Sequence, residues 1–164
     1  MDIDNAKADA MAYTDSIKPN DFELIASGTT TEEVNSIIIS QDNDGNPLEL
    51  CDMITIYTSS PIASVMSAVT VVFDGTIIHQ IANGIHNTNI SLTRLIAIHS
   101  GKRWDVFATS SFGSGGNGNV SSRMRGFSEK EKSTVKQIKL YLYNSANVLP
   151  VGFKYEIYGR RVKK

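Results

Sequence analysis

This 164-residue chain has no pair of cysteines, no long apolar run and no stretch with the pattern of a signal peptide. Cys51 is its one cysteine, so no internal disulfide can form and nothing indicates an oxidising compartment. No apolar run approaches the roughly 18 residues that span a bilayer. The N-terminus is acidic and has no apolar core segment of the kind found in signal peptides. We therefore expect neither a signal peptide nor insertion into a membrane.

Motifs of common catalytic and metal sites are missing as well. G-x-S-x-G, H-E-x-x-H and the phosphate-binding G-x-x-x-x-G-K-[ST] do not occur. The glycines 113, 115 and 118 match the dinucleotide fingerprint, but no strand–helix unit surrounds them. His79, His86 and His99 lack the short spacing that places two metal ligands on one element. The sequence therefore predicts no enzyme, no cofactor and no metal.

Residues 42–46, Asp-Asn-Asp-Gly-Asn, look like the start of a calcium loop. An EF-hand requires Gly at its sixth position and Glu at its twelfth, and these places hold Pro47 and Met53. We interpret the segment as a turn that Asx side chains stabilise through hydrogen bonds to nearby backbone amides.

Charge is distributed unevenly along the chain. Residues 1–55 contain twelve acidic and two basic residues, a net of −10, whereas residues 56–164 contain five acidic and fourteen basic residues, a net of +9. The preferred interpretation is that the two ends of the chain pair within the fold or between subunits. The alternative is a nucleic-acid surface, which would use Arg123, Arg125, Lys130, Lys132, Lys136, Lys139 and the basic residues of 160–164. No helix-turn-helix or RNP-like aromatic motif accompanies these charges, so nucleic acid is not the expected partner.

Short strand patterns fill most of the chain after residue 21. The length of 164 residues favours one domain, which can bury roughly 68–70% of its unfolded surface without disulfides or metals. Period-two alternation and β-branched residues predict eight or nine strands, at 22–26, 29–40, 48–59, 65–73, 76–81, 90–99, 104–109, 137–143 and 153–158. Asp74-Gly75 is the strongest hairpin signal. Turns every 8–14 residues or so predict an antiparallel sandwich or barrel over residues 19–164.

The last two strand patterns show the clearest alternation. Residues 138, 140 and 142 are apolar, and the pattern resumes at residues 153, 155 and 157. Residues 144–150 have the composition of a turn, so we interpret 137–159 as a pair of strands, each with one buried face. Tyr141, Tyr143 and Tyr158 would lie on the opposite side, where aromatic residues serve packing or recognition.

Two features before this strand pair bear on recognition. Residues 110–122, Ser-Ser-Phe-Gly-Ser-Gly-Gly-Asn-Gly-Asn-Val-Ser-Ser, predict a loop too poor in apolar groups to pack, and it is interpreted as a connection or a binding loop. Trp104 follows Gly-Lys-Arg at a strand start. It is the candidate ligand contact, with packing in the core as the alternative.

Residues 1–18 differ from the rest of the chain. Ile3, Ala6, Ala10, Tyr13 and Ile17 are spaced 3, 4, 3 and 4 apart, which is the a/d pattern of a coiled coil over two heptads. Pro19 would end such a helix, and two heptads are too few to be stable alone. These five residues are candidate oligomer contacts in a coiled-coil neck. An amphipathic helix lying on its own domain is the alternative.

The most distinctive sequence motifs lie in the first and last strand segments. They comprise Phe22-Glu-Leu-Ile-Ala26, Val34-Asn-Ser-Ile-Ile-Ile39, Asp44-Gly-Asn-Pro-Leu48, Ile138-Lys-Leu-Tyr-Leu142 and Leu149-Pro-Val-Gly-Phe-Lys-Tyr-Glu-Ile-Tyr-Gly-Arg160. These segments resemble jelly-roll structural proteins of tailed bacteriophages and prophages. Residues 5–17, N-A-K-A-D-A-M-A-Y-T-D-S-I, look like the Ala-rich necks of phage fibres.

The resemblance implies an all-β, antiparallel jelly-roll β-sandwich with a short N-terminal helix. It implies a non-enzymatic virion protein, either the head of a tail fibre or spike or a decoration of the capsid or tail. The implied partners are further copies in a homotrimer, other virion proteins, and a glycan or protein of the host surface. It transfers no catalytic residue. The rival hypothesis is a carbohydrate-binding module of a cellular protein, which would place two or three Trp or Tyr residues in a planar or clefted site.

Overall fold

A computed structural model describes residues 22–60, 67–83, 91–114, 117–126, 133–142 and 148–163. Eleven strands and no helix lie in these ranges. The predicted N-terminal helix, residues 1–18, lies outside them. No helix among the described residues is long and apolar enough to cross a membrane.

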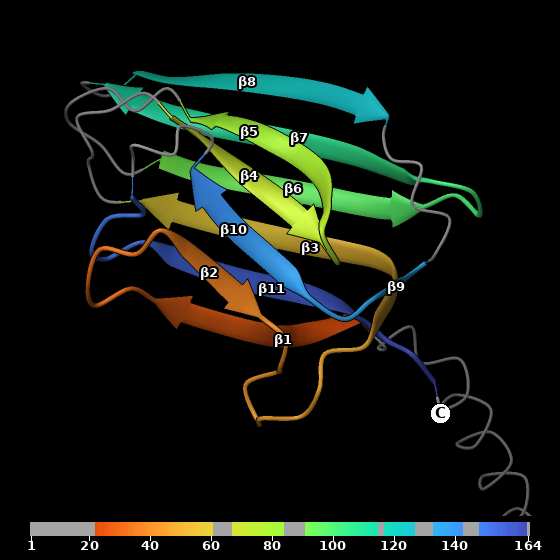
Figure 1. The fold of residues 1–164 in the computed structure, drawn as a ribbon. Helices are drawn as coiled ribbons and strands as arrows, with labels where there is room; N and C mark the ends of the chain where they lie inside the picture. Colours follow the sequence, from red (N-terminus) through yellow and green to blue (C-terminus); the bar gives the residue numbers. More distant parts are fainter. Residues whose placement is uncertain are drawn as a thin grey trace, which may run out of the picture.

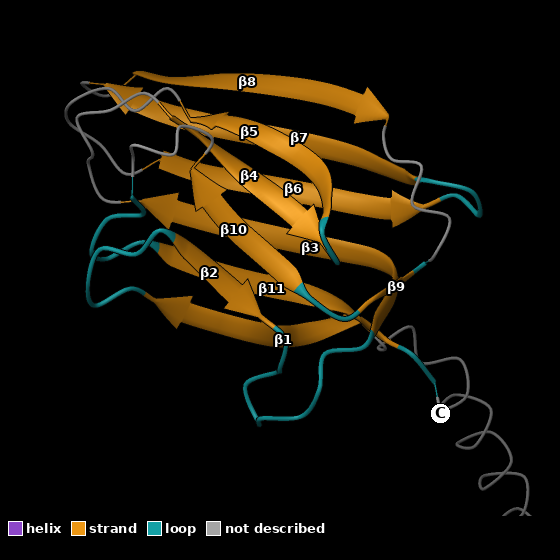
Figure 2. Ribbon diagram, in the orientation of Figure 1, coloured by secondary structure: helices purple, strands orange, loops and turns teal. Residues whose placement is uncertain are grey.

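The strands form two antiparallel sheets that pack face to face as a β-sandwich (Figures 1 and 2). The large sheet has seven strands in the order β1-β11-β3-β6-β7-β8, with β9 paired to β3, and the small sheet has the order β2-β10-β4-β5. The bounds are β1 Phe22–Thr29, β2 Ser36–Ile39, β3 Leu50–Ser60, β4 Ser67–Phe73, β5 Thr76–Asn83, β6 Ser91–His99, β7 Trp104–Ser114, β8 Asn117–Gly126, β9 Thr134–Val135, β10 Ile138–Leu142 and β11 Lys154–Arg161. The sequence prediction of an antiparallel sandwich is confirmed.

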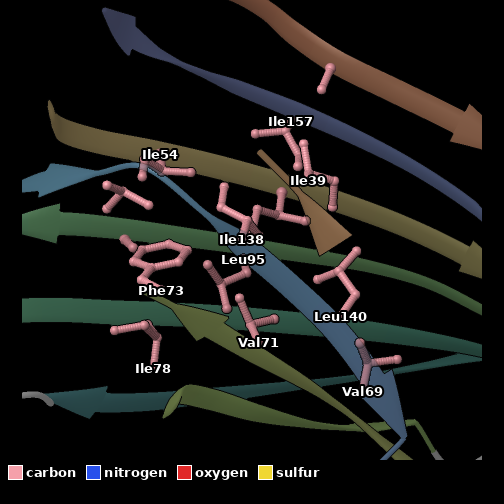
Figure 3. Packing of buried hydrophobic residues seen from close by; sticks show 14 of the residues in the cluster. Ile39, Ile54, Val69, Val71, Phe73, Ile78, Leu95, Ile138, Leu140 and Ile157 are labelled. Carbon is pink, nitrogen blue, oxygen red and sulfur yellow. The ribbon is translucent and has the colours of Figure 1, made fainter. Parts of the chain in front are cut away.

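The core lies between the two sheets and is mostly aliphatic, with Phe73, Trp104 and Phe153 as its aromatic members (Figure 3). The large sheet contributes Ile54, Leu95 and Ile157, which alternate with residues on the outer side of the same strands. The small sheet contributes Val69, Val71, Phe73, Ile138 and Leu140, all 0–1% exposed. Each such side chain stabilises the fold by about 1.5–3 kcal/mol when it is removed from water. Ile138, Leu140 and Leu142 are all buried, so the buried face predicted for residues 138–142 is confirmed.

The hairpin between β4 and β5 has the geometry that Asp74-Gly75 predicts. Asp74 has a φ of 45° and Gly75 a φ of 84°, so both central residues are left-handed, as the tight two-residue hairpin turn requires. The Asp74 carboxylate also accepts hydrogen bonds from the backbone amides of Lys136 (3.0 Å) and Gln137 (2.7 Å). The turn thereby fastens the segment that leads from β9 into β10.

The 42–46 segment is the Asx-stabilised turn that its composition predicts. Asp42 Oδ1 accepts hydrogen bonds from the amides of Asp44 (2.9 Å) and Asn46 (2.8 Å), and Oδ2 lies 2.8 Å from Arg161 Nη1. These bonds, first of all that from the Asn46 amide, lower the pKa of the Asp42 carboxyl to about 2 against the opposing effect of burial. Asn43 Oδ1 accepts from the Ser27 amide (2.9 Å), which docks the turn on β1.

The acidic first part and the basic last part of the chain meet in the fold. Strand β1 pairs with β11 over its whole length, and Arg161 joins Glu23 (2.6 Å) and Asp42 (2.8 Å) at their shared end. Lys136 lies 3.9 Å from Glu49. The expectation that opposite ends pair is confirmed for these groups. Lys130, Lys132 and Lys164, which belong to the nucleic-acid alternative, lie outside the described residues.

The prediction of a loop at 110–122 is wrong. Strand β7 continues to Ser114, and β8 begins at Asn117 and pairs with it through ten registered positions, from Ser114↔Asn117 to Asp105↔Gly126. Backbone amides and carbonyls make the ladder, so a run of Gly, Ser and Asn can extend a sheet without supplying apolar side chains. Composition alone therefore does not separate such a hairpin from a loop.

The interpretation of 137–159 as a pair of strands is also wrong in one respect. Both strands exist, but β10 pairs with β2 and β4 in the small sheet, whereas β11 lies between β1 and β3 in the large sheet. The segment between them crosses from one sheet to the other, and Val34 and Leu149 exchange two backbone hydrogen bonds there (3.1 and 2.8 Å). The alternation identifies the buried face of each strand but not its partner.

Candidate interaction face

A continuous row of large side chains crosses the outer side of the large sheet. Directly paired residues of antiparallel strands share a face, and the registers align Leu24, Tyr158, Thr55, Ile96 and Phe107 across β1, β11, β3, β6 and β7. We call the surface that contains this row the apolar face, and define it by Phe22, Leu24, Met53, Thr55, Tyr57, Ile96, Ile98, Phe107 and Tyr158.

Several of these side chains remain in water. Leu24 is 43% exposed, and Ile98 and Phe107 are each 40% exposed. Thr55, at the centre of the row, is only 2% exposed because its larger neighbours enclose it. Contiguous apolar patches on a soluble protein usually mark an interaction site, whereas single exposed apolar residues do not. The apolar face is therefore the candidate functional site.

Aromatic contacts hold part of this face in place. The rings of Phe22 and Tyr158 stack with centroids 6.3 Å apart, and Tyr57 meets Tyr158 edge to face at 5.7 Å. Such pairs add about 0.5–1.5 kcal/mol each beyond the burial of their surface. Because the planes of the two tyrosines differ by 85°, they do not form the flat platform on which a sugar ring stacks.

Opposite charges flank Tyr57 in the neighbouring row. Glu156 on β11 and Arg94 on β6 are the two residues paired directly with Tyr57 on β3. Arg94 places Cζ 5.5 Å from the centre of the Tyr57 ring, and the Tyr158 hydroxyl donates to Glu156 Oε2 at 3.1 Å. This hydrogen bond to a carboxylate favours the neutral phenol and raises the pKa of Tyr158. In the row that contains Tyr57, the β11 side of the face therefore carries a negative charge and the β6 side a positive charge.

The outer side of the small sheet is different. There the registers align Ile38, Lys139, Val72 and Ile77 across β2, β10, β4 and β5. Ile38 and Ile77 are 56% and 50% exposed, but they stand on opposite edges of the sheet, and between them lie a lysine and a valine that is only 7% exposed. Lys139 also covers the Tyr141 ring, with Nζ 5.2 Å from its centre. Exposed apolar residues on this side are therefore separate.

Trp104 is not an exposed aromatic. Its side chain is 0% exposed and packs edge to face against Phe73 of the small sheet (5.4 Å) and against His99 (5.3 Å). It lies on the inner side of β7, since Trp104 and Phe107 are an odd number of positions apart. Burial removes the premise on which it was a candidate ligand contact, and core packing, the alternative, is what the structure has.

The other candidate residues lie partly outside the described ranges. The candidate oligomer contacts Ile3, Ala6, Ala10, Tyr13 and Ile17 lie outside them. Within the described ranges, no three His, Cys, Asp or Glu side chains gather as metal ligands would. His99 packs on Trp104, and its Nδ1 accepts a hydrogen bond from the Gly101 amide (3.2 Å).

Sequence reasoning missed the apolar face, although β3 and β6 carry a signal for it. In Met53–Thr58 and in Leu95–Ile98, apolar or β-branched residues occupy both faces of the strand instead of every second position. Such runs are typical of strands buried on both sides, and here one side is open to water. No protein-family model and no curated protein sequence matches this chain.

Proposed function

We propose that this chain is a non-enzymatic structural protein of a bacteriophage particle that works by association with other proteins. The observation that carries the proposal is the apolar face, a contiguous hydrophobic surface on an otherwise well-packed sandwich. Contiguous apolar surfaces of this kind are typical of sites where another protein binds. The phage context comes from the resemblance of the strand segments described above.

The strand order supports a jelly roll as the type of sandwich. The pairs β1–β11, β2–β10, β3–β6 and β4–β5 are nested within one another, as in one long hairpin wrapped into two sheets. Two four-strand groups, β1-β11-β3-β6 and β2-β10-β4-β5, result from this nesting. Eight strands in two sheets with Greek-key connections are the jelly-roll architecture of capsid and lectin domains. Strands β7 and β8 then extend the large sheet as an added hairpin.

We further propose that the protein is a homotrimer and forms the head of a tail fibre or spike, or a capsid or tail decoration. The a/d spacing of residues 3, 6, 10, 13 and 17 supports a neck, which needs help from the sandwich because two heptads are not stable alone. The partners in this scheme are other copies, other virion proteins, and a host-surface glycan or protein.

A carbohydrate-binding module is the second candidate, and the face geometry favours it less. Tyr57 and Tyr158 are nearly perpendicular, and Trp104 is buried. The most exposed members of the face are Leu24, Ile98 and Phe107, which offer no hydrogen bonds to sugar hydroxyls. A protein surface suits these side chains better than a glycan.

Light scattering on the full chain tests the proposal. The expected mass is that of three chains, and deletion of residues 1–18 is expected to weaken the assembly. A monomer at about 100 µM, unchanged by the deletion, would remove the support for a fibre or spike head. Binding of the monomer to a glycan array would then favour the carbohydrate-binding module.

A further inference from the structure

We infer that the occupant of the apolar face is a second copy of this chain. The β1–β11 half of the face on one copy meets the β6–β7 half of the face on the next, around a symmetry axis parallel to β3. The inference rests on the proposed homo-oligomer and goes beyond it, because it assigns the contact surface and the residues that face each other.

Between β1 and β7, the central row has two large side chains on each side of β3; beyond β7 the sheet continues with β8, where Met124 is paired with Phe107. Thr55 on β3 is nearly buried, and two larger side chains lie on each side of it: Tyr158 and Leu24 toward β1, and Ile96 and Phe107 toward β7. An axis parallel to the strands brings one half of this row onto the other half in the neighbouring copy. Leu24 of one copy then contacts Phe107 of the next, and both lose the 43% and 40% of their surface that water now reaches.

The charges of the next row match under the same rotation. Glu156 and Arg94 lie one strand to either side of Tyr57, so the operation that brings Leu24 to Phe107 brings Glu156 of one copy to Arg94 of the next. Within one chain these two residues are two strand spacings apart, roughly 10 Å, with the Tyr57 ring between them. Complementary charges in the two halves of one face fix the register of a contact between identical chains.

The entry of the chain into the sandwich is compatible with this axis. Residues 1–21 join the sandwich at Phe22, whose ring stacks on Tyr158 in the apolar face. Strand β1 runs from this point antiparallel to β11, so Phe22 lies at the end of the large sheet where β11 ends. A neck is centred on the symmetry axis of its trimer, and an axis parallel to β3 lets it continue from the same end of the sheet.

Charged substitutions on the two outer sides of the sandwich test the surface. Leu24→Glu and Phe107→Glu in the full chain are expected to weaken self-association on the order of 30-fold or more, because truncation or charging of a central apolar contact removes much of the interface energy. Ile38→Glu is the matched control, since Ile38 is 56% exposed on the small sheet, and it is expected to leave the mass unchanged. Far-ultraviolet circular dichroism and a thermal melt establish that each variant is folded.

Charge exchange tests the register. Glu156→Arg and Arg94→Glu should each weaken self-association roughly 10-fold, because each places like charges across the contact, and the double variant should restore it to within about 3-fold. The same cycle measured on the unfolding of a monomeric Phe107→Glu background should show little coupling, because the two residues are far apart within one chain.

The outcomes separate the inference from the proposed function. A wild-type trimer that Leu24→Glu and Phe107→Glu leave intact would show that the face is not the contact, while the homotrimer would stand. A trimer that these variants dissociate, but in which the double charge exchange restores nothing, would overturn the register. A wild-type monomer would overturn both the homotrimer and this inference.

Discussion

The two outer sides of the sandwich carry similar amounts of exposed apolar surface on individual residues, yet only one of them is a candidate interface. On the small sheet, Ile38 and Ile77 are 56% and 50% exposed but stand on separate edges. On the large sheet, Leu24 and Phe107 are less exposed, at 43% and 40%, but belong to one unbroken row. Continuity across strands, and not the exposure of any one side chain, distinguishes a docking surface from ordinary surface hydrophobicity.

The largest expected loss of stability comes from a comparison of the inner and outer sides of the large sheet. Trp104→Ala should lower the free energy of unfolding by about 3–5 kcal/mol, because it leaves a cavity against Phe73. Phe107→Ala in the same strand should cost only about 1–2 kcal/mol in a monomer, since Phe107 is 40% exposed. Urea denaturation at low protein concentration measures both. Equal losses would mean that the outer row is part of the core and not a surface awaiting a partner.

A smaller effect is expected at the edge strand of the large sheet. A Cβ at residue 28 would lie 2.7 Å from ring atoms of Tyr155, the residue paired with Gly28 across β1 and β11. Gly28→Ala should therefore destabilise the fold by about 1–3 kcal/mol through overpacking. The measurement is chemical denaturation, and the control is the same substitution in a Tyr155→Ala background, where the loss should disappear. A persistent loss would point to the backbone of β1 instead of the ring.

A gain of stability is expected where a hydroxyl is buried without a partner. Thr70 Oγ1, on the outer side of the small sheet, and Thr58 Oγ1, on the inner side of the large sheet, are inaccessible to water and make no hydrogen bond to the part of the chain that the structure describes. Thr70→Val should raise the free energy of unfolding by about 1 kcal/mol, because it removes an unsatisfied polar atom at nearly constant shape.

Thr30→Val is the contrasting variant for this prediction. Its hydroxyl donates to the Pro150 carbonyl at 2.6 Å and accepts from the Phe153 amide at 3.0 Å, so the same change should destabilise by about 1–3 kcal/mol. Thermal unfolding of the two variants should shift in opposite directions. A lower melting temperature in Thr70→Val would indicate that the Thr70 hydroxyl does have a hydrogen-bond partner.

The last expected effect depends on pH and concerns the corner where the two sheets are joined by the 42–46 turn. The folded pKa of Asp42 is about 2, below its ordinary value of 3.8, so its contribution to stability is present above pH 3.8 and is lost as the pH falls toward 2. Wild type and Asp42→Asn should therefore differ in melting temperature near pH 6 and converge between pH 4 and pH 2 or so. A constant difference over this range would assign the stabilisation to hydrogen bonds that do not depend on charge.

The sequence predicts local features of this fold well and long-range features poorly. Alternation in residues 138–142 identifies the buried side of β10, and Asp74-Gly75 identifies a hairpin, because both depend on neighbours in the chain. The partners of β10 are β2 and β4, about 100 and 70 residues away, and no local pattern encodes such pairings. Strand β8 is not predicted for a different reason. Its Gly, Ser and Asn residues pair through their backbones as other residues do, but they give no alternating apolar pattern.

The candidate site shows the same limit. Trp104 attracts attention as a lone large aromatic, but its position in β7 turns it toward Phe73. The apolar face combines residues from five strands whose side chains align only after the register is set. Each of these residues is unremarkable in its own segment, and their significance comes from the row.

The place of β11 in the large sheet has a consequence for biosynthesis. Residues 154–161 lie between β1 and β3 and pair with both. Until translation has passed Arg161, β1 lacks its partner strand in the large sheet, and β3 is paired on the β6 side alone. A nascent chain that stops short would present two open strand edges, which are templates for aggregation. The large sheet is therefore expected to close only after β11 has been synthesised, and until then the open edges of β1 and β3 can associate with strands of neighbouring chains.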